Sequence, residues 1–82
     1  MDDGKTRAAW DQDLDAQGLL CPLPVLKARK RLAGMAQGQV LRMLATDPAA
    51  VIDVPHFCAE AGHDLLGSED QDGVQIYLIR KG

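Results

Sequence analysis

The segment LDAQGLLCPLPVLKARKRL, residues 14–32, joins the end of a predicted strand to a glycine loop and a predicted helix. Apolar residues recur at intervals of three and four from Val25 to Leu32, and basic side chains fall between them. This spacing is typical of an amphipathic helix. We expect the helix to span residues 22–35 and to end at the glycines that follow, Gly34 and Gly38.

The rest of the chain alternates between predicted strands and helices. Apolar and β-branched residues predict strands at 10–14, 39–45, 63–69 and 74–80. Asp72-Gly73 between the last two strands is a hairpin signal. Val74, Ile76 and Leu78 alternate onto one face of the final strand.

A second helix is predicted between the second and third strands, ending near Ala61. Its start is indicated by Thr46 or Asp47 as an N-cap residue, with Pro48 at the first helical position. Pro55 removes a backbone donor, so we expect it to divide this helix. The order β-α-β-α-β-β contains no repeat and predicts an α+β fold. We expect a two-layer sandwich with two helices on one face of a four-stranded mixed sheet.

Length and charge restrict the classes of function. The chain has 82 residues and a formal net charge of −3, which fits one small domain at 10–82 after a flexible tail at 1–9. An acidic chain does not attract nucleic acid overall, so no direct nucleic-acid partner is expected. The longest apolar run is too short for a membrane span, and a signal peptide pattern is missing. We therefore expect a reduced, cytoplasmic protein.

Cys21 lies between the glycine loop and the first predicted helix. The residue before a proline favours extended backbone, so Cys21 is predicted to be the N-cap residue, with Pro22 and Pro24 at the first and third helical positions. The amide of Leu23 would then be free near the sulfur. A helix N-terminus favours an anion, and we expect it to lower the thiol pKa to about 7 to 8.

The second cysteine has a different setting. Cys58 lies between Phe57 and Ala59 in an apolar helical stretch, so we interpret it as a core thiol. The distance from Cys21 in the sequence and the lack of a C-x-x-C spacing argue against a redox pair. His56 and His63 flank Cys58 without the ligand spacing of a zinc site, and no metal is predicted.

Four basic residues fall within five positions of the first predicted helix: Lys27, Arg29, Lys30 and Arg31. Such a cluster is either a solvated helix face or a docking surface for a protein partner. If the first two strands are parallel, the loops of Cys21 and Asp47 both emerge at the carboxyl ends of the strands. Asp47 is then expected to be a cap or a partner contact.

The blocks GLLCPLPVL, TDP, DVPHFC, GHDLL and YLIRKG occur in this order along the chain. In this pattern the sequence resembles the TusA (SirA-like) sulfur carrier family, with Gly18 ahead of the CPxP element and Pro22 and Pro24 within it. The resemblance implies that Cys21 accepts a persulfide sulfur from a cysteine desulfurase and passes it to a relay protein. In the TusA branch this relay leads to 2-thiouridine in tRNA. The resemblance also implies that Arg29, Asp47 and the basic face of the first helix meet the partner.

Sulfur would be carried covalently, so no cofactor is expected. A thiol of this kind, without a His-Asn or His-Asp pair as base, suits a carrier better than an enzyme with turnover of its own. A monomer would leave the Cys21 edge free for partners. Two other functions stay open: sulfur transfer in dissimilatory sulfur oxidation, and a regulatory or RNA-binding module. The second lacks paired exposed aromatic residues on its predicted strands.

Overall fold

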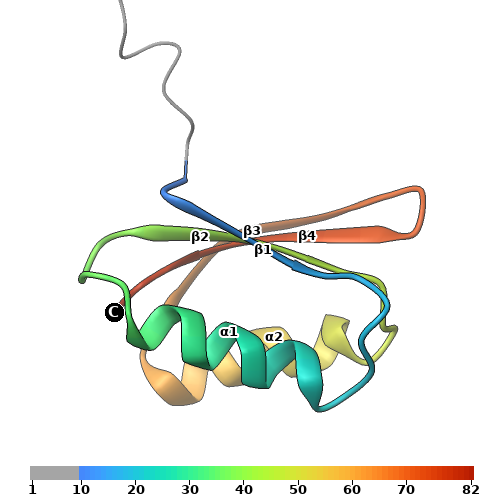
Figure 1. Ribbon diagram of the computed structural model, residues 1–82, viewed down its shortest axis with the longest axis horizontal. Helices are drawn as coiled ribbons and strands as arrows, with labels where there is room; N and C mark the ends of the chain where they lie inside the picture. Colours follow the sequence, from blue (N-terminus) through green and yellow to red (C-terminus); the bar gives the residue numbers. More distant parts are fainter. Residues whose placement is uncertain (1–9) are drawn as a thin grey trace, which may run out of the picture.

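The computed structural model describes residues 10–82, and the predicted tail at 1–9 lies outside this range. Four strands and two helices follow one another in the predicted order, as Figure 1 shows. They are β1 (Gln12–Ala16), α1 (Leu23–Ala33), β2 (Val40–Ala45), α2 (Ala50–Ala61), β3 (Asp64–Gln71) and β4 (Val74–Arg80).

The strands form one mixed sheet with the spatial order β1-β2-β4-β3. Strand β1 pairs with β2 in parallel, and β4 pairs antiparallel with both β2 and β3. Both helices lie on the same face of the sheet, below it in the view of Figure 1. This arrangement confirms the predicted α+β sandwich. Because β1 and β2 are parallel, the loop that follows β1 and the loop that follows β2 emerge at the same edge of the sheet. These two loops lead into α1 and α2.

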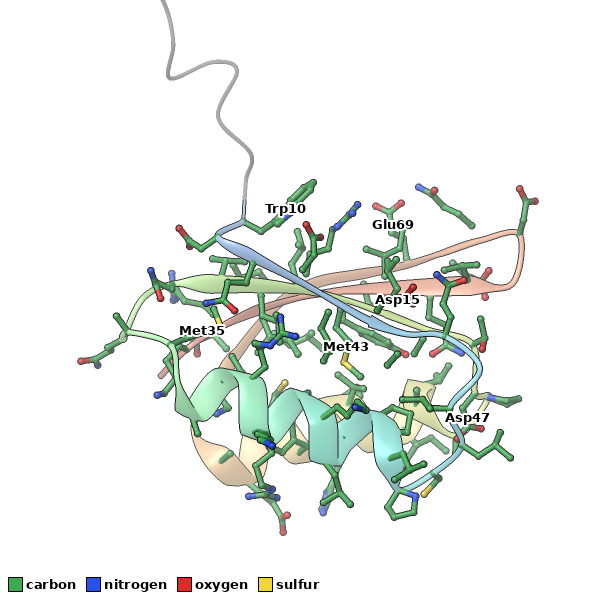
Figure 2. The ribbon with its side chains drawn as sticks, in the orientation of Figure 1. Trp10, Asp15, Met35, Met43, Asp47 and Glu69 are labelled. Atoms are coloured by element: carbon green, nitrogen blue, oxygen red, sulfur yellow. The ribbon has the colours of Figure 1, made fainter. Side chains whose placement is uncertain are left out.

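The core fills the space between the sheet and the two helices. Figure 2 shows Met43 pointing from the sheet toward the helices, while Trp10 and Glu69 lie on the opposite side. The largest fully buried side chains are Leu32, Leu41, Met43, Ile79, Val54 and Cys58. On β4 the buried residues are Gln75, Tyr77 and Ile79, so the alternating set from Val74 to Leu78 lies on the face away from the helices.

The boundaries of the edge strands differ from the prediction. Strand β1 runs over Gln12–Ala16 and not over 10–14, because its partners are Leu41–Ala45 of β2. Strand β3 extends to Gln71, two residues beyond the prediction, because pairing with β4 continues to the turn. Asp72 and Gly73 both have positive φ, 54° and 88°. A two-residue hairpin turn that matches the strand twist requires this conformation.

Helix α2 is continuous, so the prediction that Pro55 divides it was wrong. Pro55 and Val51, one turn earlier, are both exposed. Pro55 cannot donate a hydrogen bond to the carbonyl of Val51. Because this part of the helix is on the solvent side, water can bond to that carbonyl instead. The helix also begins later than predicted, at Ala50, with Ala49 and not Asp47 at the N-cap position.

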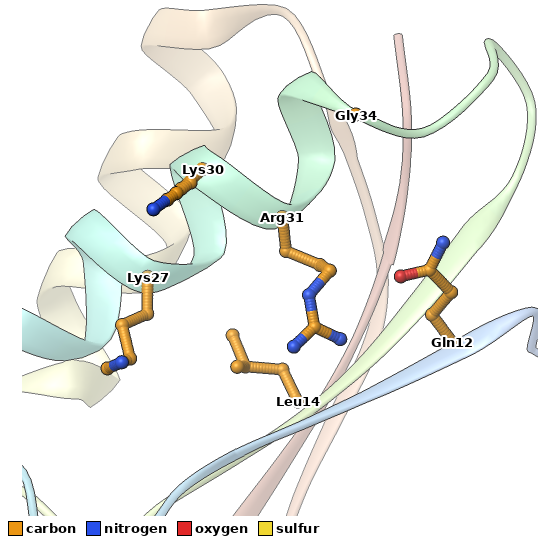
Figure 3. A pocket seen from close by; sticks show the side chains of 6 residues that line it. All are labelled: Gln12, Leu14, Lys27, Lys30, Arg31 and Gly34. Atoms are coloured by element: carbon orange, nitrogen blue, oxygen red, sulfur yellow. The ribbon is translucent and has the colours of Figure 1, made fainter.

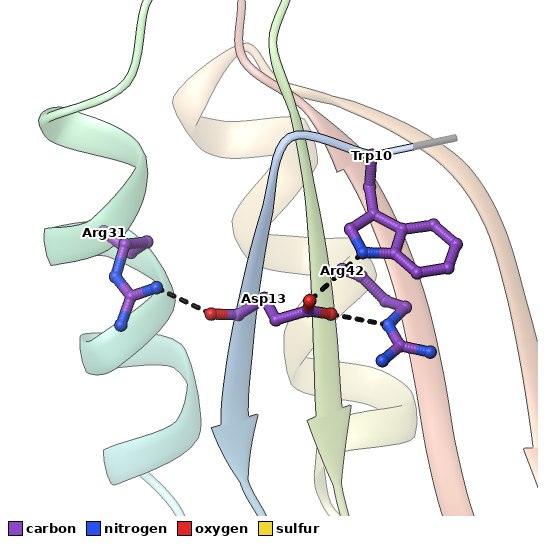
Figure 4. A network of polar contacts seen from close by, with 4 residues as sticks. All are labelled: Trp10, Asp13, Arg31 and Arg42. Atoms are coloured by element: carbon purple, nitrogen blue, oxygen red, sulfur yellow. Dashed lines mark hydrogen bonds and ion pairs between the residues drawn. The ribbon is translucent and has the colours of Figure 1, made fainter. Parts of the chain in front are cut away.

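A polar network surrounds β1 and is drawn in Figure 4. The Asp13 carboxylate accepts hydrogen bonds from Arg42 Nε at 2.7 Å and from Trp10 Nε1 at 3.2 Å. The Arg42 guanidinium also stacks over the Trp10 ring, 4.3 Å from its centroid. The backbone carbonyl of Asp13 accepts a hydrogen bond from Arg31 at 2.7 Å. This network links β1 to β2 and to α1.

Within residues 10–82, neither helix is long and apolar enough to cross a membrane.

Candidate functional site

Cys21 lies in the exposed loop between β1 and α1, at the edge where β2 also ends. Its backbone N–H donates a hydrogen bond to Asp47 Oδ2 at 2.6 Å, across 26 positions of sequence. Earlier in the loop, the Gly18 N–H donates to Thr46 Oγ1 at 2.9 Å. Gly18 has a φ of +80°, a conformation that glycine adopts without strain. These contacts confirm that the loops of Cys21 and Asp47 share one edge.

Asp47 is buried at 8% exposure and holds both loops together. Besides the Cys21 amide, its carboxylate accepts the Ala49 N–H at 3.1 Å, which resembles the predicted capping contact. Its backbone carbonyl accepts a hydrogen bond from Gln75 Nε2 at 2.9 Å, and the Tyr77 hydroxyl donates to Gln75 Oε1. A chain of buried polar groups thus runs from β4 to the Cys21 loop. Only the three-dimensional packing reveals the contribution of Gln75 and Tyr77.

The junction between Cys21 and α1 differs from the prediction. Pro22, not Cys21, is the N-cap residue, and Pro24 stands at the second helical position. The Cys21–Pro22 peptide bond is cis. The Leu23 N–H donates to the Leu20 carbonyl at 2.9 Å, which closes a turn around Cys21 before the helix begins. The amide that was expected to stabilise a thiolate is therefore already paired.

Cys21 opens into a shallow pocket of about 230 Å³ between the two helices, here called the thiol pocket. The first helix contributes Val25 and Arg29, whose guanidinium stacks over the Phe57 ring of α2 at 5.0 Å from its centroid. The side chains of this pocket come from Cys21, Pro22, Val25, Arg29, Asp53, His56, Phe57 and Glu60. It is therefore a partly apolar depression with charged groups from both helices.

The pKa of the Cys21 thiol is raised above its ordinary value, so the predicted lowering was wrong. The main cause is the neighbouring Asp53 carboxylate, which raises the pKa because it favours the thiol as a hydrogen-bond donor. Partial desolvation and the negative charges of Asp53 and Asp47 act in the same direction. Sequence reasoning missed Asp53 because the pairing of α2 with the Cys21 loop depends on how the two helices pack.

The four basic residues of α1 do not form a single patch. Arg29 faces the thiol pocket, whereas Lys27, Lys30 and Arg31 line a groove of about 400 Å³ beside β1. Figure 3 shows these three side chains with the other lining residues, Gln12, Leu14 and Gly34. We call this the basic groove. The cluster predicted from the sequence is thus divided between two sides of one helix.

The structure confirms Cys58 as a core thiol, because its side chain is only 1% exposed. Burial raises the pKa of the Cys58 thiol to about 11. Among residues 10–82, the structure contains no group of three or more His, Cys, Asp or Glu side chains that could hold a metal ion. His56 instead lies 3.4 Å from Glu60, and His63 packs against Phe57 with ring centroids 5.6 Å apart.

Comparison with known proteins places this chain in a family. Residues 12–81 match the family model described as sulfurtransferase TusA. The sulfur carrier protein TusA of Allochromatium vinosum is 47% identical, with 90% of this chain and 97% of the relative covered. Its counterpart in Pseudomonas entomophila is 46% identical, over 87% and 89% of the two chains. The crystal structure of a SirA-like protein from Desulfitobacterium hafniense superposes with a TM-score of 0.79 at 27% identity, covering 88% of this chain and 99% of that one.

Proposed function

The chain belongs to the TusA sulfurtransferase family, and on this basis we propose that it is a sulfur carrier that holds a persulfide on Cys21. The donor is a cysteine desulfurase, and the acceptor is the next protein of a sulfur relay. The observation that carries this proposal is the position of Cys21. Its sulfur is exposed, its loop is anchored to Asp47, and a shallow pocket leaves room for a partner's cysteine.

The loading step is an exchange of one sulfur atom. Cys21 loses its proton, and its sulfur attacks the outer sulfur of the donor's cysteine persulfide. A new S–S bond forms on Cys21, the S–S bond of the donor breaks, and the donor cysteine leaves as a thiolate that takes up a proton. Delivery repeats this exchange with the acceptor's thiolate as nucleophile. Neither step needs an external oxidant or a cofactor.

The partner surfaces follow from the two faces of α1. We propose that Arg29 meets the desulfurase directly, because it borders the thiol pocket. Lys27, Lys30 and Arg31 extend the positive surface away from the thiol and steer the partner from a greater distance. Asp47 is buried, so its part in docking is to hold the Cys21 loop in shape. A monomer leaves all of these surfaces accessible.

We propose the route to 2-thiouridine in tRNA, in the cytoplasm, as the pathway that the carrier serves. It acts there through protein partners and without turnover of its own. Residues 10–82 form the functional unit.

Sulfur transfer in dissimilatory sulfur oxidation uses the same chemistry with other partners. Growth of a deletion strain separates the two: loss of tRNA thiolation supports the first route, and loss of sulfur oxidation with normal tRNA supports the second.

Intact mass measurement tests the carrier function. The protein is mixed with a cysteine desulfurase and cysteine, and the mass is read without reductant. We expect one added sulfur on the wild-type chain and on Cys58→Ala, and none on Cys21→Ser. An added sulfur that is lost in Cys58→Ala and retained in Cys21→Ser would show that the site assignment is wrong.

A further inference from the structure

The unloaded thiol lies between two carboxylates that act on different atoms of Cys21. Asp47 accepts the backbone N–H at 2.6 Å, while the Asp53 carboxylate lines the same thiol pocket as the Cys21 side chain. Asp53 stands in the first turn of α2 and is half-buried within the thiol pocket. The loop and the second helix thus bring an acidic side chain to the reactive sulfur.

The other charged groups of the thiol pocket have partners of their own. His56 Nε2 lies 3.4 Å from Glu60 Oε2, and both side chains are largely exposed. The Arg29 guanidinium lies over the Phe57 ring. A carboxylate beside a thiol favours the protonated thiol and repels the thiolate. Asp53 therefore acts on Cys21 in the direction opposite to that needed for a nucleophile.

We propose that Asp53 is a positioning residue that keeps unloaded Cys21 protonated, so that the thiol reacts slowly until a docked sulfur donor engages the carboxylate. The inference rests on the proposed carrier function and adds a device that confines sulfur transfer to bound partners. When the donor contacts the Asp53 carboxylate, Cys21 releases its thiol proton. The departing thiolate of the donor's cysteine takes up this proton, so the exchange is balanced. In the loaded form the negative charge lies on the outer sulfur, one S–S bond of about 2.05 Å farther from the carboxylates.

Alkylation measures this effect without any sulfur donor. The full chain is treated with iodoacetamide between pH 6 and pH 10, and the rate at Cys21 is followed by peptide mass. We expect Asp53→Asn to move the midpoint of the rate profile to lower pH and to raise the rate at pH 7.5 about threefold or more. A tenfold gain in thiolate corresponds to about threefold in rate, because nucleophilicity falls as the pKa falls.

Two variants separate the specific contact from general charge. Glu60→Gln removes a carboxylate from the same thiol pocket, and its rate profile should stay within twofold of the wild type. Asp53→Glu keeps the carboxylate. The midpoint of its alkylation rate profile should therefore lie closer to that of the wild type than the midpoint of Asp53→Asn does. Circular dichroism spectra identify any variant that does not fold, and the folded variants decide the comparison.

Three results would overturn the inference. The first is an Asp53→Asn profile that superposes on the wild type. The second is an equal gain in rate at every pH, which would indicate easier access and not a changed pKa. The third is an effect of Glu60→Gln as large as that of Asp53→Asn. The carrier function is judged separately, because a wild-type chain that takes no sulfur from a desulfurase refutes that function whatever the alkylation profile.

Discussion

Cys58 is a single buried thiol whose ionisation is coupled to folding. Its folded pKa is about 11, and an unfolded cysteine titrates at about 8.5. Above that unfolded pKa, the unfolded chain releases a proton that the folded chain retains. The free energy of unfolding should therefore fall as pH rises from about 8.5 to 11.

The prediction is tested with Cys58→Ala, which loses stability from the cavity at every pH but should show a shallower decline in alkaline solution. Urea unfolding midpoints at pH 8 and pH 10.5 give the comparison, and the contribution of Tyr77, whose pKa is also raised by burial, is common to both proteins. Equal declines would contradict the assignment. In the folded wild type at pH 8, iodoacetamide should modify Cys21 and leave Cys58 intact.

Asp47 is the residue that fixes the backbone of Cys21. Asp47→Ala leaves the N–H groups of Cys21 and Ala49 without their acceptor, and each such loss costs about 1 to 3 kcal/mol where water cannot replace it. We expect lower stability by chemical unfolding and faster hydrogen exchange at the Cys21 amide. Asp47→Asn keeps an acceptor oxygen and should lose less. An unchanged exchange rate in Asp47→Ala would refute the anchoring role.

At the scale of single elements, β1 depends on the carboxylate of Asp13. The hydrogen bond from Arg42 holds the pKa of Asp13 below its ordinary value, so this contact stabilises the fold above about pH 4 and is lost as acid protonates the folded carboxylate. Asp13→Asn should be less stable than the wild type at pH 7 and equally stable below the folded pKa. Trp10 fluorescence reports the unfolding, since Trp10 is the single tryptophan. A difference that persists in strong acid would refute the ion-pair account.

Helix α1 presents two different surfaces, and docking should distinguish them. Arg29→Gln removes a charge beside the thiol, while Lys30→Gln removes one from the basic groove. We expect the first variant to slow the initial rate of sulfur loading from a cysteine desulfurase by on the order of threefold more than the second. The lysine variant should change mainly the dependence of the rate on salt. Equal losses would mean that the partner covers both sides of α1.

At the scale of the whole molecule, the order of elements and the position of the exposed thiol could be predicted from the sequence. Periodicity sets which residues are buried, and the glycine and prolines around Cys21 set where the chain enters helix α1. The reactivity of the thiol could not be predicted, because it depends on Asp53, which approaches only through the packing of α2. Likewise, helical spacing places Arg29 near Lys30 but does not say which neighbour each one faces.

The hydrogen bond from Gln75 to the carbonyl of Asp47 has a consequence for the order of events during synthesis. Gln75 lies in β4, the final strand, whereas Cys21 precedes the first helix. A ribosome must therefore translate past Gln75 before the side chain that supports the Asp47 anchor of the cysteine loop exists. A nascent chain that stops before β4 lacks this support, so the anchored form of the cysteine loop is complete only after the β3–β4 hairpin has been synthesised.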